Sequence, residues 1–291
     1  MRLDDQRESD NVEDMRGASG GFGLGGRTIG IGGVVIALVA SYFLGVDPSV
    51  LLGMMSGGDS GAPATSQVQQ GPAPRPPHED KQAMLVSHVL SSTEDAWTQV
   101  FREAGKTYQP PKLTIFSGGF PTACGTGQAA MGPFYCPLDH KVYIDLQFFQ
   151  TMRDRFHATG DFAQAYVIAH EVGHHVQQLL GITDKMESMR SRGSRADSNA
   201  MSVKLELQAD CFAGVWAART EKSKHFLDAG DVEKALAAAS AIGDDTLQKQ
   251  TQGRVVPDSF THGTSEQRVR WLRKGLESGD VQACDTFRSQ L

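Results

Sequence analysis

The segment His170-Glu171-Val172-Gly173-His174 has the clearest chemistry in the chain. Residues four apart lie on one face of an α-helix, so the two imidazoles can point at one metal ion. Glu171 is turned about 60° from His174 around the helix axis, so its carboxylate can reach a metal-bound water without binding the metal. The pattern therefore predicts one zinc ion (Zn2+) held by His170 and His174, with Glu171 as the catalytic base. His175 is turned about 100° from His174 and is not expected to be a ligand.

A catalytic zinc ion needs a third protein ligand and keeps one position open. Glu206 and Asp210, also four residues apart, lie in a second segment with helical spacing. We expect Glu206 to bind the metal. We expect Asp210 to accept a hydrogen bond from the free N–H of a zinc-binding imidazole, which fixes the tautomer of that ring. A solvated pair of acids is the alternative, and the apolar neighbours of the pair disfavour it.

The segments AHEVGHHVQ and ELQADCFAG, together with the N-terminal RESDNVED and an apolar run at residues 28–46, resemble the bacterial family of putative neutral zinc metallopeptidases. H-E-x-x-H followed by E-x-x-x-D is the gluzincin pattern, and the resemblance covers most of the chain. It implies a zincin-like peptidase domain. It also makes His262 a candidate catalytic residue that stabilises the oxyanion, because gluzincins place a histidine near the scissile carbonyl. The family segment often has Pro after this histidine, where this chain has Gly263.

The elements that must position these residues are mainly helices. Apolar spacing predicts helices at 81–104, 161–180, 199–220, 231–241 and 265–277. Residues 113–116, 134–135 and 141–146 are predicted strands. A few strands followed by several helices predict an α+β fold, mainly helical, with a small β-sheet.

Composition predicts four regions. Residues 1–27 are polar and Gly-rich and are expected to be a disordered tail in the cytoplasm. Residues 28–46 are apolar, carry no charge and are long enough for a transmembrane helix. Residues 47–79 are expected to be a flexible linker, because Ser, Gly, Pro and Gln dominate most of this stretch. The metallopeptidase domain is expected at 80–291.

The flanks of the apolar run predict its orientation. Arg2, Arg7, Arg16 and Arg27 precede the run, and no Lys or Arg follows until Arg75. The positive-inside rule then places the N-terminus in the cytoplasm and the catalytic domain outside the inner (cell) membrane of a bacterium, as a single-pass protein. A cleaved signal peptide is the alternative, which the long N-terminal extension disfavours.

The four cysteines, Cys124, Cys136, Cys211 and Cys284, form no C-x-x-C pair, so a thiolate zinc site is not expected. In an exported domain, Cys124 with Cys136 can close a short loop, and Cys211 with Cys284 can tie a helix to the C-terminus. Four buried thiols are the alternative, and sequence alone does not decide between the two.

These observations predict a membrane-anchored zinc peptidase that acts on peptides or proteins. A net charge of −6 and the absence of a basic run give no support to nucleic-acid binding. An extended substrate is expected to pair with an exposed strand edge, with 141–146 as the candidate. The alternatives are a non-proteolytic zinc-binding assembly or adaptor protein at the membrane and a metal-dependent cell-wall amidase. Glu171 favours an enzyme, because a structural zinc site needs no base. The sequence does not fix the substrate or the oligomeric state.

Overall fold

The computed structural model describes residues 1–3, 6–17, 74–128, 132–190 and 194–289. Its helices are α3 (Lys81–Glu103), α4 (Gln147–Phe156), α5 (Asp161–Leu179), α6 (Ile182–Arg190), α7 (Arg195–Lys224), α8 (Asp231–Ala241), α9 (Asp244–Gln252) and α10 (Ser265–Ser278). Two short 3-10 helices are η2 (Pro257–Ser259) and η3 (Val281–Cys284). The strands are β1 (Val12–Asp14), β2 (Lys112–Phe116), β3 (Gly119–Thr122), β4 (Gly125–Gln128), β5 (Phe134–Cys136) and β6 (Lys141–Asp145).

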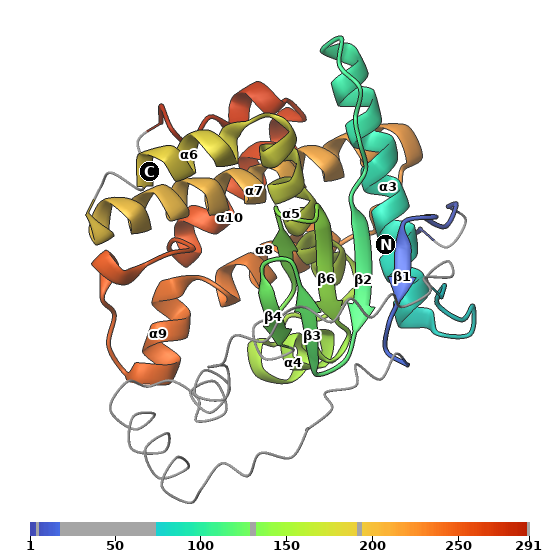
Figure 1. Cartoon of the computed structure of the whole chain (residues 1–291), viewed down its shortest axis with the longest axis horizontal. Coiled ribbons are helices and arrows are strands. Elements are labelled where there is room, and N and C mark those ends of the chain that lie inside the picture. The colour runs from blue at the N-terminus through green and yellow to red at the C-terminus, as the bar shows by residue number, and fades with distance from the viewer. Residues whose placement is uncertain (4–5, 18–73, 129–131, 191–193, 290–291) are drawn as a thin grey trace, which may run out of the picture. The chain divides into compact units, whose positions relative to one another are not determined.

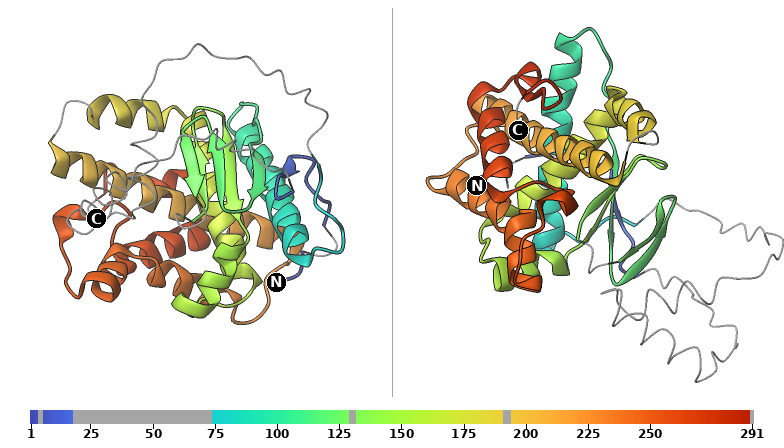
Figure 2. Two further views of the ribbon diagram at one scale, coloured as in Figure 1. Left: turned by 60° about the horizontal axis from the view of Figure 1, so that its bottom comes forward. Right: turned by 90° about the vertical axis from the view of Figure 1, so that its left-hand side faces the viewer.

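Four strands form the main sheet in the order β1-β2-β6-β5, and β3 and β4 form a separate antiparallel hairpin (Figure 1). β1, β2 and β6 run parallel, and the edge strand β5 runs antiparallel to β6. Side chains alternate across the sheet, so Val142 and Ile144 enter the main core while Tyr143 faces the other way. There Tyr143 packs with Phe116 and with Phe120 of the hairpin. Most of the helices lie together on one side of the strands (Figure 2, right).

Two long helices, α5 and α7, cross at the centre of the helical layer. Helix α5 is buried along most of its length, and α7 begins with a capping box between Ser194 and Asp197. Helix α10 packs closely on α7 because glycines lie at the contact. A Cβ atom at Gly275 would overlap the carbonyl of Cys211, and one at Gly214 would lie 2.6 Å from the backbone nitrogen of Leu276.

The predicted α+β class and the predicted small sheet are confirmed. The five predicted helices correspond to α3, α5, α7, α8 and α10, although α7 begins at Arg195, four positions before the predicted start at Asn199, and ends at Lys224. Helices α4, α6 and α9 and the β3–β4 hairpin were not predicted. Helix α9 (DDTLQKQTQ) contains one large apolar residue, Leu247, so apolar spacing gives no signal there.

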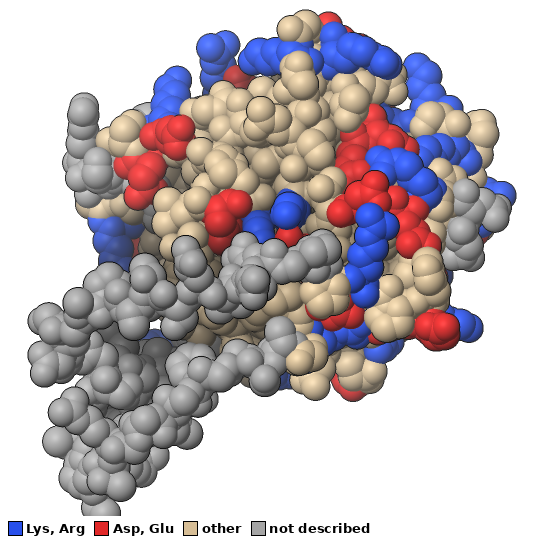
Figure 3. All heavy atoms as spheres, turned by 45° about the vertical axis from the view of Figure 1, so that its right-hand side comes forward, with Lys and Arg blue, Asp and Glu red and all other residues tan. Residues whose placement is uncertain are grey.

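The prediction of a disordered N-terminal tail is wrong for residues 1–3 and 6–17. Val12, which is 3% exposed, pairs with Leu113, and Leu3 is 2% exposed in the main core. Arg7, Ser9 and Asn11 donate hydrogen bonds to the carboxylate of Glu94 on α3, at 2.6, 2.5 and 2.8 Å. Figure 3 turns this side of the molecule forward and shows acidic and basic side chains beside one another.

This packing also corrects the predicted topology. A single crossing at residues 28–46 would place residues 1–17 and the catalytic domain on opposite sides of a membrane. Instead, β1 is hydrogen-bonded to β2 within one sheet, so the two segments share one side. The predicted single-pass inner-membrane protein with its N-terminus in the cytoplasm and its catalytic domain outside therefore does not agree with the structure.

The predicted span itself, 28–46, lies outside the described residues, as does nearly all of the predicted linker at 47–79. Among the residues that are described, no helix combines the length and the apolar character needed to cross a bilayer.

Candidate metal centre

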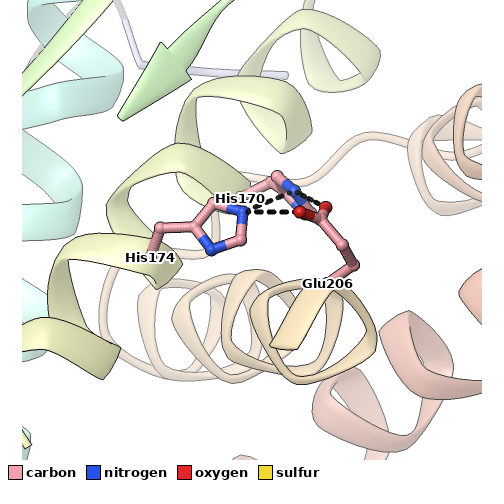
Figure 4. Close-up of side chains that lie close together, drawn as sticks. All are labelled: His170, His174 and Glu206. Atoms are coloured by element: carbon pink, nitrogen blue, oxygen red, sulfur yellow. Dashed lines mark hydrogen bonds and ion pairs between the residues drawn. The ribbon is translucent and has the colours of Figure 1, made fainter. Parts of the chain in front are cut away.

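Helices α5 and α7 bring His170, His174 and Glu206 together (Figure 4). The Nε2 atom of His170 lies 3.1 Å from Oε2 of Glu206 and 3.2 Å from Nε2 of His174. The Nε2 atom of His174 lies 3.5 Å from Oε1 of Glu206. Within the described part of the chain this is the one group of three such residues whose ligand atoms all lie within 4.8 Å of one another. Two imidazole nitrogens and one carboxylate oxygen are the donor set of a catalytic zinc site, so these residues fit the metal.

A glycine inside the motif allows the two helices to approach. A Cβ atom at Gly173 would lie 3.0 Å from the carbonyl oxygen of Ala209 and 3.1 Å from its Cα atom. A side chain at this position would require the backbone of Ala209 to move by a few tenths of an ångström. Because Gly173 lies between the two histidines and Ala209 lies between Glu206 and Asp210, this close contact sets the spacing of the metal ligands.

Asp210 lies behind His170, as the sequence led us to expect. Its Oδ1 atom is 2.8 Å from Nδ1 of His170, and its carboxylate is fully buried. A carboxylate accepts, so Nδ1 of His170 carries a proton, and Nε2 is the atom that can bind a cation in exchange for its own proton.

His174 is oriented in the same way by an amide. Its Nδ1 atom lies 2.9 Å from Oε1 of Gln177, whose amide nitrogen donates to the carbonyl of Leu205 and to the side chain of Gln208. Because its amide nitrogen is used as a donor, Gln177 presents its oxygen to His174. The Nε2 atom of His174 is then also free to bind a cation.

Two residues at Asp210 were not found by sequence reasoning. Arg268 of α10 donates from Nε to Oδ2 of Asp210 at 2.8 Å and from Nη2 to Oδ1 at 2.9 Å. Tyr166 donates its hydroxyl to Oδ1 at 2.6 Å. Tyr166 precedes His170 by four residues, so helical spacing could have placed it on the same face. Arg268 has no such local signal.

The charges around the histidines favour a bound cation. Burial alone would lower the pKa of His170, but the carboxylates of Asp210 and Glu206 raise it to about 10. Burial raises the pKa of Glu206, but His174 and His170 hold it well below its usual range. Because its pKa is raised, His170 stays protonated in the metal-free protein, at the position where a divalent cation would bind.

Glu171 lies at the same cleft and is 8% exposed. Burial raises its pKa, and the neighbouring His170 and His174 oppose that shift. No side chain or backbone group in the described ranges hydrogen-bonds to its carboxylate. Glu171 is therefore free to exchange a proton with a ligand in the cleft.

The cleft has a volume of about 940 Å³. Its walls come from the β3–β4 hairpin, the edge strand β5, and helices α4, α5, α6, α7, α9 and α10. The aromatic side chains that line it include Phe134, Phe148 and Phe156, and the candidate metal ligands line the same space. The cleft is large enough for several residues of an extended peptide.

His262, the predicted oxyanion stabiliser, also lines this cleft. Its Nδ1 atom lies 3.3 Å from Oδ1 of Asp244, and a hydrogen bond to that carboxylate raises the pKa of His262 although burial opposes the shift. Oδ2 of Asp244 accepts the backbone N–H groups of Thr261, His262 and Gly263 at 2.7, 2.6 and 3.1 Å. Asp244 was missed because nothing local links it to a loop 17 residues later in the chain.

His175 faces away from the metal ligands. Its ring lies between Tyr135 of β5 and the carbonyl of Gln109. Burial lowers the pKa of His175 to about 4, so the ring is neutral near pH 7.

The structure joins Cys124 to Cys136 and Cys211 to Cys284, the two pairings that the sequence suggested. The first attaches the turn of the β3–β4 hairpin to the end of β5 at the rim of the cleft. The second joins α7 to η3, and the carbonyl of Cys284 accepts a hydrogen bond from Gln208 at 3.0 Å.

An H-E-x-x-H helix that meets a glutamate from a second helix beside a cleft is an arrangement that could hold a zinc ion. The chain belongs to the family described as "Putative neutral zinc metallopeptidase", whose sequence model matches residues 1–287.

Two relatives illustrate the extent of the similarity. "Uncharacterized protein YpfJ" of Escherichia coli strain K12 is 52% identical over 294 residues, which cover 99% of both chains. "Uncharacterized protein Rv2575" of Mycobacterium tuberculosis strain H37Rv is 44% identical over 190 residues, which cover 62% of this chain and 63% of that protein. No solved structure matches the chain, so the zincin-like part of the fold prediction stays a prediction.

Proposed function

We propose that the protein is a zinc-dependent peptidase that hydrolyses peptide bonds in its cleft, with Glu171 as the general base. The observation that carries the proposal is the grouping of His170, His174 and Glu206 next to Glu171, whose carboxylate has no other partner in the described part of the chain. A site that only stabilised the fold would need no base and would not open into a cleft.

Zinc held by His170, His174 and Glu206 would supply a Lewis acid that acidifies a water and polarises the scissile carbonyl. The carboxylate of Glu171 takes the proton of that water and later passes it to the nitrogen of the leaving amine. Burial raises the pKa of Glu171, which makes it a stronger base for this transfer.

Two further residues, Asp210 and His262, contribute hydrogen bonds to this mechanism. Asp210 keeps the Nδ1 proton of His170 in place, so the ring does not turn or lose its tautomer during the reaction. His262, held by Asp244, donates a hydrogen bond to the carbonyl oxygen as negative charge develops there.

An extended substrate pairs with the outer edge of β5, where no other described strand pairs with it. The sequence pointed to residues 141–146 as the edge, but β6 is interior, with β2 on one side and β5 on the other. β5 is the outermost strand next to the cleft, and Pro133 and Pro137 flank it and line the same cleft. An antiparallel edge of this kind can accept a peptide through backbone hydrogen bonds.

The test is zinc analysis combined with digestion of unfolded casein, with and without a chelator. We expect one zinc ion per chain, chelator-sensitive cleavage, and loss of cleavage in Glu171→Gln with zinc retained. Glu233→Gln, a change of the same kind at an exposed position on α8, is the control. A zinc-loaded wild type that cleaves no peptide would instead support a non-catalytic zinc protein, and cleavage of purified cell-wall fragments alone would support an amidase.

A further inference from the structure

The edge strand β5 is tied to the metal-binding helix by a hydrogen bond between Tyr135 and His175. The hydroxyl of Tyr135 lies 3.0 Å from Nδ1 of His175, and Nε2 of His175 lies 2.7 Å from the carbonyl oxygen of Gln109. A carbonyl oxygen only accepts, so Nε2 carries the proton and Nδ1 is an acceptor. The hydroxyl of Tyr135 therefore donates to His175.

The same hydroxyl has a second partner. Nδ1 of His140 lies 3.2 Å from the oxygen of Tyr135. Because the hydroxyl proton is used toward His175, His140 donates from Nδ1. A line of three hydrogen bonds thus runs from the loop before β2, through α5 and β5, to the turn between β5 and β6. Because Tyr135 already donates its hydroxyl proton to His175, its expected role is to hold the strand in place and not to donate that proton to a substrate.

The ring of His175 is held firmly. It is 2% exposed and packs edge-on against Tyr108 and Tyr135, with ring centres 5.9 and 5.4 Å away. His175 follows His174 directly, and successive side chains on a helix are turned by about 100°. On one turn of α5, His175 therefore contacts the edge strand β5, while the preceding residue, His174, is one of the candidate metal ligands.

We propose that Tyr135 and His175 are positioning residues that hold the edge of β5 at a fixed distance from His170, His174 and Glu206. This inference rests on the proposed function, in which an extended peptide pairs with β5. The pair then determines where the scissile carbonyl of the bound peptide lies. Reacting groups must approach to about 3–3.5 Å, and a misplacement of about 1 Å can lower the rate about hundred-fold.

Tyr135→Phe tests this with little change in volume. The control is Tyr143→Phe on the neighbouring strand β6, which removes a hydroxyl that donates to Asp139 at 2.8 Å on the other face of the sheet. Both variants and the wild type are assayed on a long internally quenched peptide and on a blocked dipeptide that is too short to pair with β5. Zinc content is measured in parallel.

We expect Tyr135→Phe to lower kcat on the long peptide about ten- to hundred-fold while its KM changes less. Cleavage of the dipeptide and zinc content stay within about two-fold of the wild type, and Tyr143→Phe stays near the wild type on both substrates. An equal effect of the two variants on the long peptide would overturn the inference. An equal loss of cleavage activity on both substrates in Tyr135→Phe would also overturn it, because such a result indicates a general loss of structure.

The proposed function can fail separately, if the wild type cleaves neither peptide. Amide hydrogen exchange of Phe134–Cys136 then decides the inference. Exchange that is faster in Tyr135→Phe than in Tyr143→Phe shows that the bond holds the strand, and equal exchange rejects it.

Discussion

Arg268 holds the carboxylate of Asp210 through two hydrogen bonds, from Nε to Oδ2 at 2.8 Å and from Nη2 to Oδ1 at 2.9 Å. Arg268 is 3% exposed and the Asp210 side chain is fully buried. Since Asp210 also contacts His170, this ion pair joins three helices, α10, α7 and α5, behind the candidate metal ligands.

The first prediction concerns this buried ion pair. Arg268→Ala leaves the charge of Asp210 buried without its partner, which costs about 3–5 kcal/mol of folding free energy. Arg75→Ala, which breaks an exposed pair with Asp10, should cost at most about 1 kcal/mol. Urea unfolding of both variants measures the difference. A cost for Arg268→Ala as small as that for Arg75→Ala would show that the Asp210 carboxylate is solvated or protonated.

The second prediction separates metal affinity from activity. Asp210→Asn removes the negative charge behind His170 and should weaken zinc binding about 10- to 100-fold. Asp244→Asn changes a buried aspartate whose bonds go to His262 and its loop instead, so zinc affinity should stay unchanged while peptide cleavage falls. Competition with a chelating dye measures the affinity. Equal affinities in the two variants would remove Asp210 from the support of the metal.

The third prediction follows from the pKa of His170, which is about 10 without a metal. The folded-state pKa lies above the unfolded value of about 6.5, so this group stabilises the metal-free protein fully below pH 6.5 and the contribution is lost as the pH rises toward 10. Thermal unfolding of the metal-free protein between pH 6.5 and 10 should show the loss.

Zinc changes that pH dependence. A ligand nitrogen must be free of its proton, so the apparent zinc affinity should rise with pH, by about ten-fold per unit for each proton displaced. The zinc-loaded protein should then lack the His170-linked loss of stability above pH 6.5. A metal-free protein whose stability does not fall over this range would contradict the raised pKa.

Local spacing accounts for what the sequence could predict about the site. His170, Glu171, His174, Glu206 and Asp210 lie on two helices, and each pair four residues apart shares a face whatever the rest of the fold is. Arg268 and Asp244 reach the site from separate helices, and their contacts depend on tertiary packing. Only the glycines at the helix contacts hint at that packing, and a glycine in a sequence does not name its neighbour.

In the N-terminal segment, polar composition predicted disorder where the structure shows order. The segment is ordered by partners that composition does not reveal: the edge of β2 with which β1 pairs, and the carboxylate of Glu94, which is 6% exposed. Leu3 and Val12 supply the apolar contacts. A few well-placed groups outweigh the average polarity of a short segment when a folded surface is present to receive them.

The fourth prediction tests that segment. Ser9→Ala removes a donor at 2.5 Å from Glu94 and should cost about 1–3 kcal/mol, because a buried carboxylate loses one of its hydrogen bonds. Ser223→Ala on the exposed side of α7, whose hydroxyl donates to carbonyls of its own helix, should change stability by less than about 0.5 kcal/mol. Equal stabilities of the two variants would mean that the N-terminal segment contributes little to the domain.

The fifth prediction compares the two disulfides. Cys211–Cys284 closes a loop of 73 residues and Cys124–Cys136 one of 12. On the loop-entropy account, removing them costs about 4 and about 3 kcal/mol respectively, so their effects on the free energy of unfolding differ only slightly.

The two disulfides should differ more clearly in their effects on the metal site and the cleft. The carbonyl of Cys284 accepts from Gln208, which bonds Gln177, the partner of His174, so the double variant Cys211→Ala/Cys284→Ala should weaken zinc binding. The double variant Cys124→Ala/Cys136→Ala frees the hairpin at the rim of the cleft, and it should raise KM for long peptides while zinc affinity stays the same. Zinc titration and peptide kinetics on both variants decide the matter, and a zinc affinity that falls only when the hairpin disulfide is removed would reverse the assignment.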